Sequence, residues 1–356
     1  MEIIKLSKNK YKEWDKFCLE SDSAWFWHTT KWLNYTLNYR SELETKNLSF
    51  FVYKEGNIMA VVLLTIEKNK DNIYEFSFGG GYIPSPVLKN NLSNLEENLV
   101  RLFIFQEIDK MAREKNVARA IFKQLPISPS LLNKDINFNY LMQFGYIDSS
   151  LNTQIIDLRK SEEELSSDLR RNHKRNIKKA KDFKINFFTS KNITDNVFDN
   201  YKQMHHKASG RKTRTDITFE MMHKWIKEDL AFLVAIELNN KYIGFEYYSV
   251  YKNNVYGFSA ANDPGFSHLP IRHFLEWESI LWMKKQGYDF YEIGLQKYGA
   301  LLYDFPDKKQ LDISHFKKGF GGFVSPLFMG EKYYNKDFFL KVYNERVKKF
   351  AYSLNI

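Results

Sequence analysis

The sequence has a single cysteine, Cys18, among its 356 residues, and this scarcity excludes several kinds of site. A disulfide framework needs paired cysteines, and a thiolate zinc site needs more than one. Nothing in the sequence places a His and Asn pair beside Cys18, so a cysteine nucleophile is not expected either. We therefore expect any chemistry to proceed without a thiol.

Long hydrophobic runs are also missing. No stretch of 18 or more uncharged apolar residues occurs, so no transmembrane helix is predicted. Residues 1–14 lack the apolar segment of a secretory signal peptide. The expectation is a cytoplasmic protein.

The composition is that of a folded protein large enough for two cores. Hydrophobic residues make up 44% and charged residues 27%. A chain of 356 residues exceeds the usual ceiling for one hydrophobic core, so two domains of roughly 150 to 200 residues are expected.

The net charge of +10 and a pI near 9.2 favour an anionic partner. RNA, a nucleotide-linked substrate, coenzyme A and an acidic membrane surface all fit. The chain is rich in Lys and Asn, however, and coding bias alone produces such a charge. Local clusters of charge are therefore more informative than the total.

The apolar pattern of the first half predicts a hairpin, a strand, a helix and a strand. Residues 48–66 form two apolar runs around a Gly/Asn turn, and residues 72–87 form a third run that ends in glycines and prolines. Residues 95–116 have apolar positions at helical spacing, and residues 118–126 form the next strand. A boundary is expected near residue 150.

The same order returns in the second half. Residues 231–262 predict three strands with short polar turns, residues 274–289 a helix, and residues 290–295 a strand. The repeated order indicates an internal duplication. Residues 336–356 have apolar positions with a period of 3.6, which predicts a terminal helix.

The densest charge cluster lies in residues 161–182, which we predict as one helix. Ser161 is a suitable N-cap, and three glutamates follow it in the first turn. Four basic residues then fall on one face at i, i+3, i+4 and i+7: Arg171, Lys174, Arg175 and Lys178. This stripe is a candidate for phosphate or RNA contact, and a solvated surface helix is the alternative.

Residues 201–215 combine histidines and basic residues around Ser209 and Gly210, which is typical of a phosphate-binding loop. Arg211 is the candidate anion-binding residue of this segment. Adjacent histidines point apart on a helix or a strand, so a metal site shared by His205 and His206 is not expected.

Residues 258–279 pass from a strand into a helix that begins after Pro270. The segment has no glycine between residues 266 and 279, which argues against a backbone cradle for pyrophosphate at this helix. Arg272 is a candidate substrate-binding residue, with an ordinary surface arginine as the alternative.

Residues 289–300 form a strand and a glycine-containing loop. Glu292 is a candidate general base if it is buried, because burial raises the proton affinity of a carboxylate. Tyr291 is a candidate substrate contact. The alternation along the strand does not show which face Glu292 occupies, so an exposed or structurally paired glutamate remains the alternative.

Residues 315–326 alternate aromatic residues with lysines and then glycines, which predicts a loop that presses its backbone against a ligand. Lys317 or Lys318 would stabilise negative charge at an acyl carbonyl or at a leaving ribose oxygen, and Phe316 would stack beneath. This segment is the first-ranked candidate site, and a β-bulge with surface lysines is the alternative.

Six segments, in this order, resemble the FemAB family of peptidyl transferases. They are WFWHTTKW, GYIPSPV, TQIIDLRKSEEELSSDLRRNHKRNIKKA, YKQMHHKASGRK, YEIGL and FKKGFGG. The resemblance spans nearly the whole chain and implies an α/β fold of two tandem GNAT-like domains, each a mixed sheet flanked by helices. It places the first domain at residues 1–150, the second at 151–329, and a returning helix at 330–356 against the first.

The resemblance also implies site residues and substrates. Trp32 would contact substrate from an N-terminal helix, Arg211 would contact phosphate, and Phe316 with Lys317 would form the catalytic pair. The donor would be acyl-CoA or aminoacyl-tRNA, with no tightly bound cofactor and no metal. The acceptor would be a nucleotide-linked or glycan amine.

One departure from the family bears on the acceptor. Trp32 is followed by LNYTLNYR, whereas the family usually has a lysine shortly after this tryptophan. We therefore expect an N-acyltransferase that acts on a cell-envelope precursor or surface glycan rather than on a UDP-linked muropeptide.

Two alternatives remain. The first is a non-catalytic RNA- or anion-binding protein that uses residues 161–182. The second is a membrane-associated assembly factor that partitions through the aromatic residues 25–27.

Overall fold

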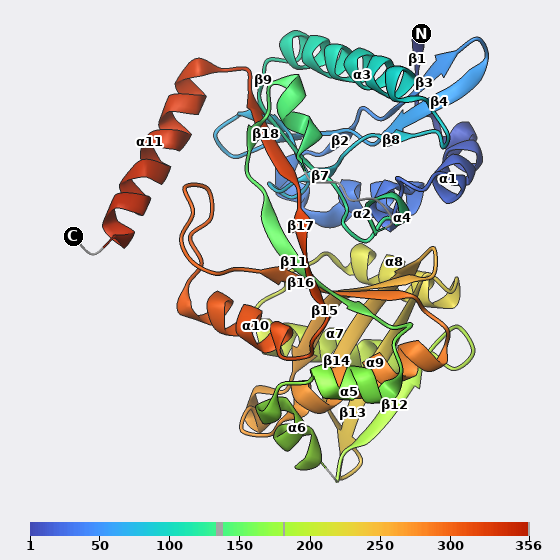
Figure 1. Cartoon of the computed structure of the whole chain (residues 1–356), viewed down its shortest axis with the longest axis vertical. Helices are drawn as coiled ribbons and strands as arrows, with labels where there is room; N and C mark the ends of the chain where they lie inside the picture. The colour runs from blue at the N-terminus through green and yellow to red at the C-terminus, as the bar shows by residue number, and fades with distance from the viewer. Residues whose placement is uncertain (133–137, 181, 355–356) are drawn as a thin grey trace. The chain divides into compact units, whose positions relative to one another are not determined.

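The computed structural model describes residues 1–132, 138–180 and 182–354 of the chain. It divides into two compact units (Figure 1). Unit 1 contains residues 1–152, 297–311 and 326–356, and unit 2 contains residues 153–296 and 312–325. Each unit has its own sheets and helices.

Unit 1 contains two sheets. The four-stranded sheet has the order β1-β3-β4-β8, and the larger one has the order β10-β18-β9-β6-β5-β2, with β7 beside β9. The strands are β1 (Glu2–Lys5), β2 (Lys46–Asn47), β3 (Phe50–Lys54), β4 (Asn57–Val62), β5 (Thr65–Lys68), β6 (Tyr74–Phe76), β7 (Ile83–Pro84), β8 (Val87–Leu88), β9 (Val117–Lys123), β10 (Ile147–Asp148) and β18 (Met329–Tyr333). The α-helices are α1 (Tyr11–Glu20), α2 (Thr30–Tyr39), α3 (Asn94–Glu114), α4 (Pro129–Leu132) and α11 (Lys336–Ser353).

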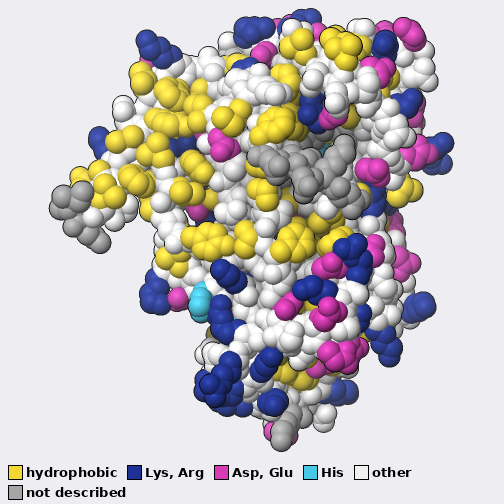
Figure 2. Space-filling view, in the orientation of Figure 1, with side chains coloured by type: hydrophobic (Ala, Val, Ile, Leu, Met, Phe, Trp, Pro, Cys, Tyr) yellow, Lys and Arg dark blue, Asp and Glu magenta, His cyan; other side chains and the backbone are white. Residues whose placement is uncertain are grey.

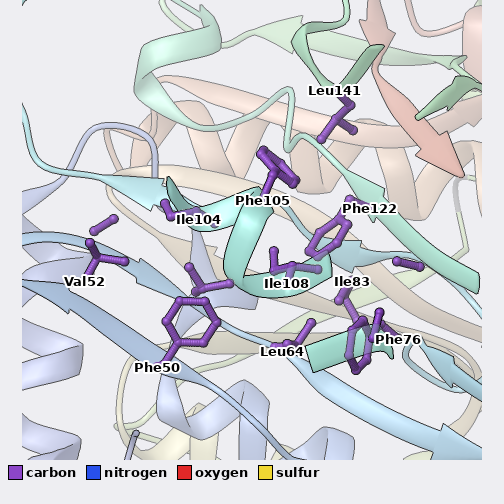
Figure 3. Packing of buried hydrophobic residues seen from close by; sticks show 14 of the residues in the cluster. Phe50, Val52, Leu64, Phe76, Ile83, Ile104, Phe105, Ile108, Phe122 and Leu141 are labelled. Carbon is purple, nitrogen blue, oxygen red and sulfur yellow. The ribbon is translucent and has the colours of Figure 1, made fainter. Parts of the chain in front are cut away.

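The core of unit 1 forms between these sheets and α3. Phe50 of β3, Phe105 of α3 and Phe122 of β9 are almost completely buried and belong to one hydrophobic cluster (Figure 3). Ser93 caps α3 in a capping box with Glu96, which fixes where the helix starts. The helix then joins two parallel strands, β6 and β9, as a parallel crossover requires.

Unit 2 contains one sheet of order β12-β13-β14-β15-β16-β11-β17. The strands are β11 (Leu151–Asp157), β12 (Lys184–Phe188), β13 (Ala231–Leu238), β14 (Lys241–Tyr251), β15 (Asn254–Asn262), β16 (Phe290–Gln296) and β17 (Phe323–Leu327). The α-helices are α5 (Glu162–Asp168), α6 (Arg171–Lys178), α7 (Asp195–Ser209), α8 (Asp216–Lys227) and α9 (Ile271–Lys285). Helix α10 (Lys308–Lys318) begins in unit 1, and its residues from 312 onward belong to unit 2.

The predicted repeat of elements is present in both units. In unit 1, the hairpin β3–β4 is antiparallel and β6–α3–β9 forms a parallel crossover. In unit 2, β13, β14 and β15 are antiparallel neighbours, and β15–α9–β16 forms the corresponding parallel crossover. The prediction of tandem α/β halves with mixed sheets and flanking helices is confirmed.

The prediction of one helix over residues 161–182 is wrong, because α5 and α6 are separate helices. Leu169 and Arg170 have extended backbone angles between them, and the Arg170 N–H donates to the Gly319 carbonyl instead of continuing the helix. Leu169 is buried by this turn. Ser161 caps α5 as predicted, and it forms a capping box with Glu164.

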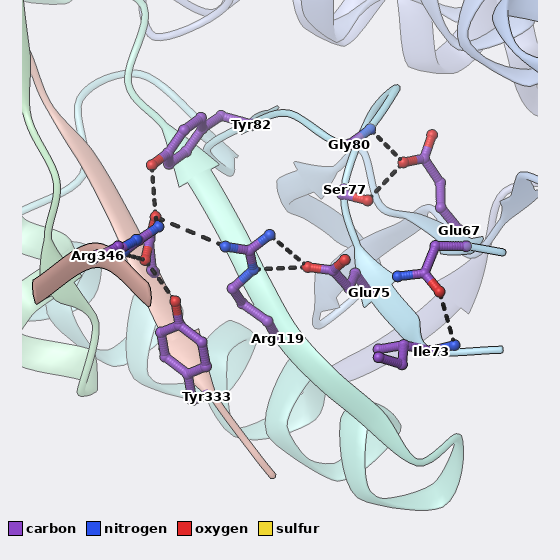
Figure 4. A network of polar contacts seen from close by, with 11 residues as sticks. Glu67, Ile73, Glu75, Ser77, Gly80, Tyr82, Arg119, Tyr333 and Arg346 are labelled. Carbon is purple, nitrogen blue, oxygen red and sulfur yellow. Dashed lines mark hydrogen bonds and ion pairs between the residues drawn. The ribbon is translucent and has the colours of Figure 1, made fainter. Parts of the chain in front are cut away.

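A buried polar network in unit 1 holds α11 to the sheet (Figure 4). Nη1 and Nη2 of Arg346 on α11 donate to the Glu331 carboxylate of β18, at 2.7 and 2.8 Å. Arg119 of β9 lies 2.7 Å from Glu75 and 3.9 Å from Glu331. Tyr333 also donates to Glu331. The two carboxylates are therefore matched by two arginines.

Candidate active site

The candidate active site is built where β15 and β16 of unit 2 separate. Residues 254–256 of β15 pair in parallel with residues 290–292 of β16. The pairing ends there, although β15 continues to Asn262 and β16 to Gln296. A glycine follows the paired segment on each strand. A Cβ at Gly257 would lie 3.0 Å from the Tyr291 hydroxyl, and a Cβ at Gly294 would lie 2.6 Å from Lys317 Nζ. The glycines thus leave room for polar side chains at this point.

Arg272 at the start of α9 holds two buried carboxylates together. Its Nη1 lies 2.7 Å from Glu246 Oε2 of β14, and its Nη2 lies 2.6 Å from Glu276 Oε1, one helical turn further along α9. Tyr248 donates to Glu246, and Tyr291 donates to Glu276, each at 2.9 Å. Glu246 and Glu276 are 4% and 2% exposed, so these contacts replace most of their hydration.

The protonation of this cluster is unusual. Burial, together with the negative charge of Glu246, raises the pKa of Glu276 to about 8. Burial alone would lower the pKa of Arg272, but the charges of Glu246 and Glu276 raise it, so this guanidinium stays charged. At neutral pH the cluster therefore holds a carboxyl group that is mostly protonated.

Lys317 brings an amine to the same cluster. It lies in the last turn of α10 and is partly buried. Burial lowers the pKa of Lys317, and the charges of Glu276 and Glu246 oppose that shift. An amine that is partly desolvated and lies beside acidic groups can carry or release a proton near neutral pH more readily than a surface lysine.

The end of α10 is fixed by close packing. His173 Nε2 lies 2.9 Å from the Phe316 carbonyl oxygen, and the Phe316 ring lies 5.2 Å from that of Phe320. His273 also packs edge-on against Phe316, at 5.0 Å. Burial lowers the pKa of His273 to about 4, so this ring is neutral at neutral pH.

The prediction of a ligand-contacting loop at residues 315–326 needs correction. Phe316, Lys317 and Lys318 are helical, and the loop begins only at Gly319. A Cβ at Gly319 would clash with the His173 ring, and a Cβ at Gly322 would lie 2.2 Å from the Ile155 carbonyl oxygen. These glycines therefore press against the protein's own chain.

The other candidate residues from the sequence occupy different surroundings. Glu292 is buried and accepts a hydrogen bond of 2.8 Å from Thr153 Oγ1. Lys318 is exposed. Arg211 is also exposed, in the segment that follows α7, and it takes no part in the hydrogen bonds and ion pairs around Arg272. The structure thus brings Lys317, Arg272 and Tyr291 together and leaves Arg211 outside this cluster. Glu292 also lies near enough to Lys317 for its charge to oppose the lowering of the Lys317 pKa.

The segment around Arg211 is not a continuous loop, because α7 extends through Ser209. Arg214 is a partly buried cation of this segment, and its Nη1 lies 2.9 Å from His205 Nε2 and 3.1 Å from Ser259 Oγ. In unit 1, Trp32 is 6% exposed and stacks on Tyr35 at 4.9 Å.

The aromatic residues 25–27 are core residues of unit 1. Trp25 and Phe26 are completely buried, and Trp27 is 5% exposed. The alternative in which this stretch partitions into a lipid surface is therefore wrong, because covered rings cannot contact lipid. No helix in the described ranges is long and apolar enough to cross a membrane.

Sequence reasoning missed Glu246 and Glu276. A signal was present, because Glu246 is the one acid of β14, and Arg272 and Glu276 have the i, i+4 spacing of an ion pair. Within the described part of the chain, no group of His, Cys, Asp or Glu is arranged to hold a metal ion.

Comparison with known proteins supports an assignment of the fold. Residues 167–305 match the family described as "Acetyltransferase (GNAT) domain". The crystal structure of FemX superposes with a TM-score of 0.65 at 14% identity, over 96% of this chain and 100% of FemX. The chain has the fold of FemX. This likeness confirms the predicted FemAB-like, tandem GNAT architecture.

Two further solved structures are similar to this chain, with lower TM-scores. The C-terminal domain of a putative lysylphosphatidylglycerol synthetase from Agrobacterium fabrum has a TM-score of 0.52 at 13% identity, over 91% of this chain and 92% of that domain. L-PGS from Bacillus licheniformis has a TM-score of 0.51 at 13% identity, over 92% of this chain and 97% of that one. A search of curated protein sequences finds no match.

Proposed function

We propose that this chain transfers an acyl or aminoacyl group from an activated donor to an amine on a cell-envelope precursor or surface glycan. The observation that carries the proposal is the position of Lys317 Nζ, over Gly294 of β16 and in the field of Glu246 and Glu276. The match of residues 167–305 to a GNAT acetyltransferase domain supports the same class of reaction.

The reaction is a direct acyl transfer. The acceptor nitrogen attacks the carbonyl carbon of an ester or thioester, a C–N bond forms, and the C–O or C–S bond to the carrier breaks. The nitrogen loses one proton and the carrier atom gains one. An ammonium group at Lys317 Nζ stabilises the negative oxygen that develops on the attacked carbonyl. Positioning and charge stabilisation suffice without a covalent enzyme intermediate.

Other residues have proposed supporting roles. Arg272 and Tyr291 hold the two carboxylates in fixed positions around the amine. Glu292 is the proposed proton acceptor, and its hydrogen bond from Thr153 fixes its carboxylate. Arg211, exposed after α7, is the proposed contact for a phosphate group of a substrate.

The donor is acyl-CoA or aminoacyl-tRNA. The segment before α9 gives no support to coenzyme A in the usual GNAT position. It has no glycine between residues 266 and 270, and Pro270 occupies the N-cap of α9 without a side-chain cap. Asp263, which begins the segment, is a buried carboxylate paired with Lys207 and Lys241.

The test is an assay of donors on the purified full-length chain. Acyl-CoA thioesters and charged tRNA would be supplied separately with an amine acceptor, and the N-acylated product detected by mass spectrometry. Thermal unfolding with each donor gives an independent readout, because a ligand that binds the native state raises the melting temperature. We expect one donor class to give both product and stabilisation.

Lys317→Ala should slow product formation by about 10³, whereas Lys309→Ala, a change of an exposed lysine on the same helix, should not. Failure of every donor in both readouts, with the wild-type protein folded, would reject the transferase proposal.

A further inference from the structure

A cavity of about 240 Å³ lies in unit 1 beyond the carboxyl ends of β7 and β9. These two strands pair in parallel, and their last residues, Pro84 and Lys123, are partners in the sheet. The residues that follow, Ser85 on one strand and Gln124 on the other, both line the cavity. Ligands of α/β sheets bind in crevices outside the carboxyl ends of the strands, so the position suits a binding site.

Arg101 of α3 is held in a fixed orientation at this cavity. Its guanidinium forms an ion pair with Glu97, one helical turn earlier, and its Cζ lies 3.9 Å from the centre of the Tyr140 ring. The side chains of Arg101 and Glu97 are 21% and 27% exposed, and both line the cavity. Among the residues that the structure describes, Glu97 is the one acid paired with Arg101. A guanidinium has five N–H donors, so some remain for a second carboxylate.

Gln124 adds a buried amide to the wall of the cavity. The residue is 4% exposed, and its Nε2 donates to Asn139 Oδ1 at 3.2 Å. Within the described ranges of the chain, no group donates a hydrogen bond to Gln124 Oε1. Buried amide oxygens are nearly always hydrogen-bonded in folded proteins. This oxygen is therefore suited to accept a hydrogen bond from a ligand in the cavity.

The lining combines charges of both signs with an apolar wall. In the described part of the chain, two acids and two bases line the cavity: Asp22, Glu97, Lys89 and Arg101. Figure 2 shows acidic and basic side chains mixed over the part of the view where Figure 1 places α3. Apolar side chains complete the wall: Leu88, Leu125 and Pro129. A ligand that matches this lining has a cation and an anion close together beside an apolar group.

We propose that this cavity binds a free α-amino acid with a small apolar side chain. The carboxylate of the amino acid lies on the guanidinium of Arg101, because a planar carboxylate fits the fork of guanidinium donors. The ammonium group has three donors, which match the oxygens of Glu97 and Gln124 Oε1. The apolar side chain lies against Leu88 and Leu125. This binding does not depend on the proposed transferase function.

The size and charge of the cavity argue against other ligands. Pockets for drug-sized molecules measure about 300 to 1,000 Å³, so a nucleotide or coenzyme A is too large for 240 Å³. An inorganic anion would pair with Arg101 and Lys89 but would face the carboxylate of Glu97. Like charges brought together in this way oppose binding, whereas a zwitterion places each charge against its opposite.

The test is isothermal titration calorimetry on the purified full-length chain, with L-alanine, L-valine and L-leucine as probes. Two analogues of L-leucine each lack one charge: L-leucinamide has no carboxylate, and isocaproate has no ammonium group. We expect at least one of the three amino acids to bind. Each analogue should bind at least about tenfold more weakly than L-leucine, because it loses a charge-assisted hydrogen bond.

Two variants locate the bound amino acid. Arg101→Gln should weaken binding of L-leucine and isocaproate by about tenfold and leave L-leucinamide unchanged, because the carboxylate loses its partner. Glu97→Gln should weaken L-leucine and L-leucinamide and should not weaken isocaproate. The matched control is Arg113→Gln, which removes the same charge from an exposed position near the end of α3 and should bind L-leucine as the wild type does.

Circular dichroism shows whether each variant is folded, and the analogue series on the wild-type chain tests the proposal without any variant. Absence of binding by all three amino acids would overturn the proposal. Isocaproate binding as tightly as L-leucine would also overturn it, because the cavity would then hold a simple anion. Unchanged L-leucine affinity in folded Arg101→Gln would place the amino acid elsewhere.

The amino-acid site and the transferase are tested separately. Lys317→Ala should bind L-leucine with unchanged affinity, because Lys317 does not line the cavity. Loss of L-leucine binding in folded Lys317→Ala would place the amino acid at the candidate active site and overturn the proposal. The titrations contain no acyl donor, so absence of product in the donor assay would leave their result intact.

Discussion

Two buried arginine networks, one in each unit, differ in how their charges balance. In unit 1, Arg346 and Arg119 face Glu331 and Glu75, so each carboxylate has a guanidinium partner. Burial alone would raise the pKa of Glu331, but the hydrogen bonds and charge of Arg346 lower it below its ordinary value. This network holds ionised groups in fixed pairs, which suits a structural role for α11.

The network of unit 2 has one arginine for two carboxylates. Arg272 contacts both Glu246 and Glu276, and the pKa of Glu276 is raised to about 8 as a result of burial and of Glu246. Lys317 brings a further basic group to the region, and its own pKa is lowered by burial. The pKa values of Glu276 and Lys317 are therefore shifted toward each other. Such shifts suit the cluster to a catalytic role rather than to a structural one.

The largest expected effect is on catalysis by Lys317. We expect Lys317→Ala to lower kcat by about 10³, because removal of one preformed donor to a developing oxyanion costs about 10² to 10³. Lys317→Arg should retain more activity, since it keeps the positive charge. The measurement is kcat under saturating donor and acceptor.

The pH profile tests the role of that charge. An ammonium is present below its pKa, so the wild-type rate should decrease as pH rises through the lowered pKa of Lys317. The Lys317→Arg rate should not decrease over this range. A wild-type rate that rises instead would show that Lys317 acts as a base.

The second effect tests the balanced network of unit 1. Arg346→Ala leaves Glu331, which is 2% exposed, without its bidentate partner. We expect a loss of about 3 kcal/mol in the free energy of unfolding, as is usual when one member of a buried pair is removed. Chemical denaturation measures this loss. Lys341→Ala, an exposed change on the same helix, should cost less than about 0.5 kcal/mol.

The sequence was sufficient to predict those elements that have a clear local pattern. The period of the apolar residues predicted α3, α9 and α11, and the polar turns predicted the strands β13, β14 and β15. The break between α5 and α6 was missed because no proline or glycine marks it. It depends on Gly319, which accepts the Arg170 N–H from 149 residues away in the chain.

The site was predicted less completely for the same reason. Lys317 stood out as part of an unusual run of lysines, aromatics and glycines. Its surroundings come from β14, α9 and β16, and only the folded sheet brings Glu246 and Glu276 to it. Local patterns do not contain such pairings.

The third effect compares the pH dependence of stability in the two networks. The pKa of Glu276 is raised in the folded state. The stability that Glu276 contributes is therefore fully present below the pKa of this group in the unfolded chain, and it is lost as pH rises through the folded-state pKa of about 8. The pKa of Glu331 is lowered in the folded state. The stability that Glu331 contributes is therefore present above the pKa of this group in the unfolded chain, and it is lost as pH falls through the folded-state pKa.

Glutamine substitutions of Glu276 and Glu331 should therefore change the free energy of unfolding with opposite pH dependence. Glu276→Gln should gain stability relative to the wild type between pH 5 and pH 9, by about 2 kcal/mol, because it removes the cost of ionising a buried carboxyl. Glu331→Gln should be most harmful at neutral pH and least harmful near pH 3. Urea denaturation at several pH values measures both, and parallel curves for the two variants would contradict the comparison.

The smallest effect concerns the glycine that makes room for Lys317. A Cβ at Gly294 would lie 2.6 Å from Lys317 Nζ, and Gly294 has φ = +112°, which disfavours any side chain. We expect Gly294→Ala to cost about 1 to 2 kcal/mol of stability and to displace the amine, so that kcat decreases while the folded state persists. Gly299→Ala is the control, because a Cβ there meets nothing within 4 Å. A variant Gly294→Ala that lowered stability but left kcat unchanged would show that the position of Lys317 against β16 does not matter for catalysis. Lys317 would then have a structural role, as the ion pairs of unit 1 have.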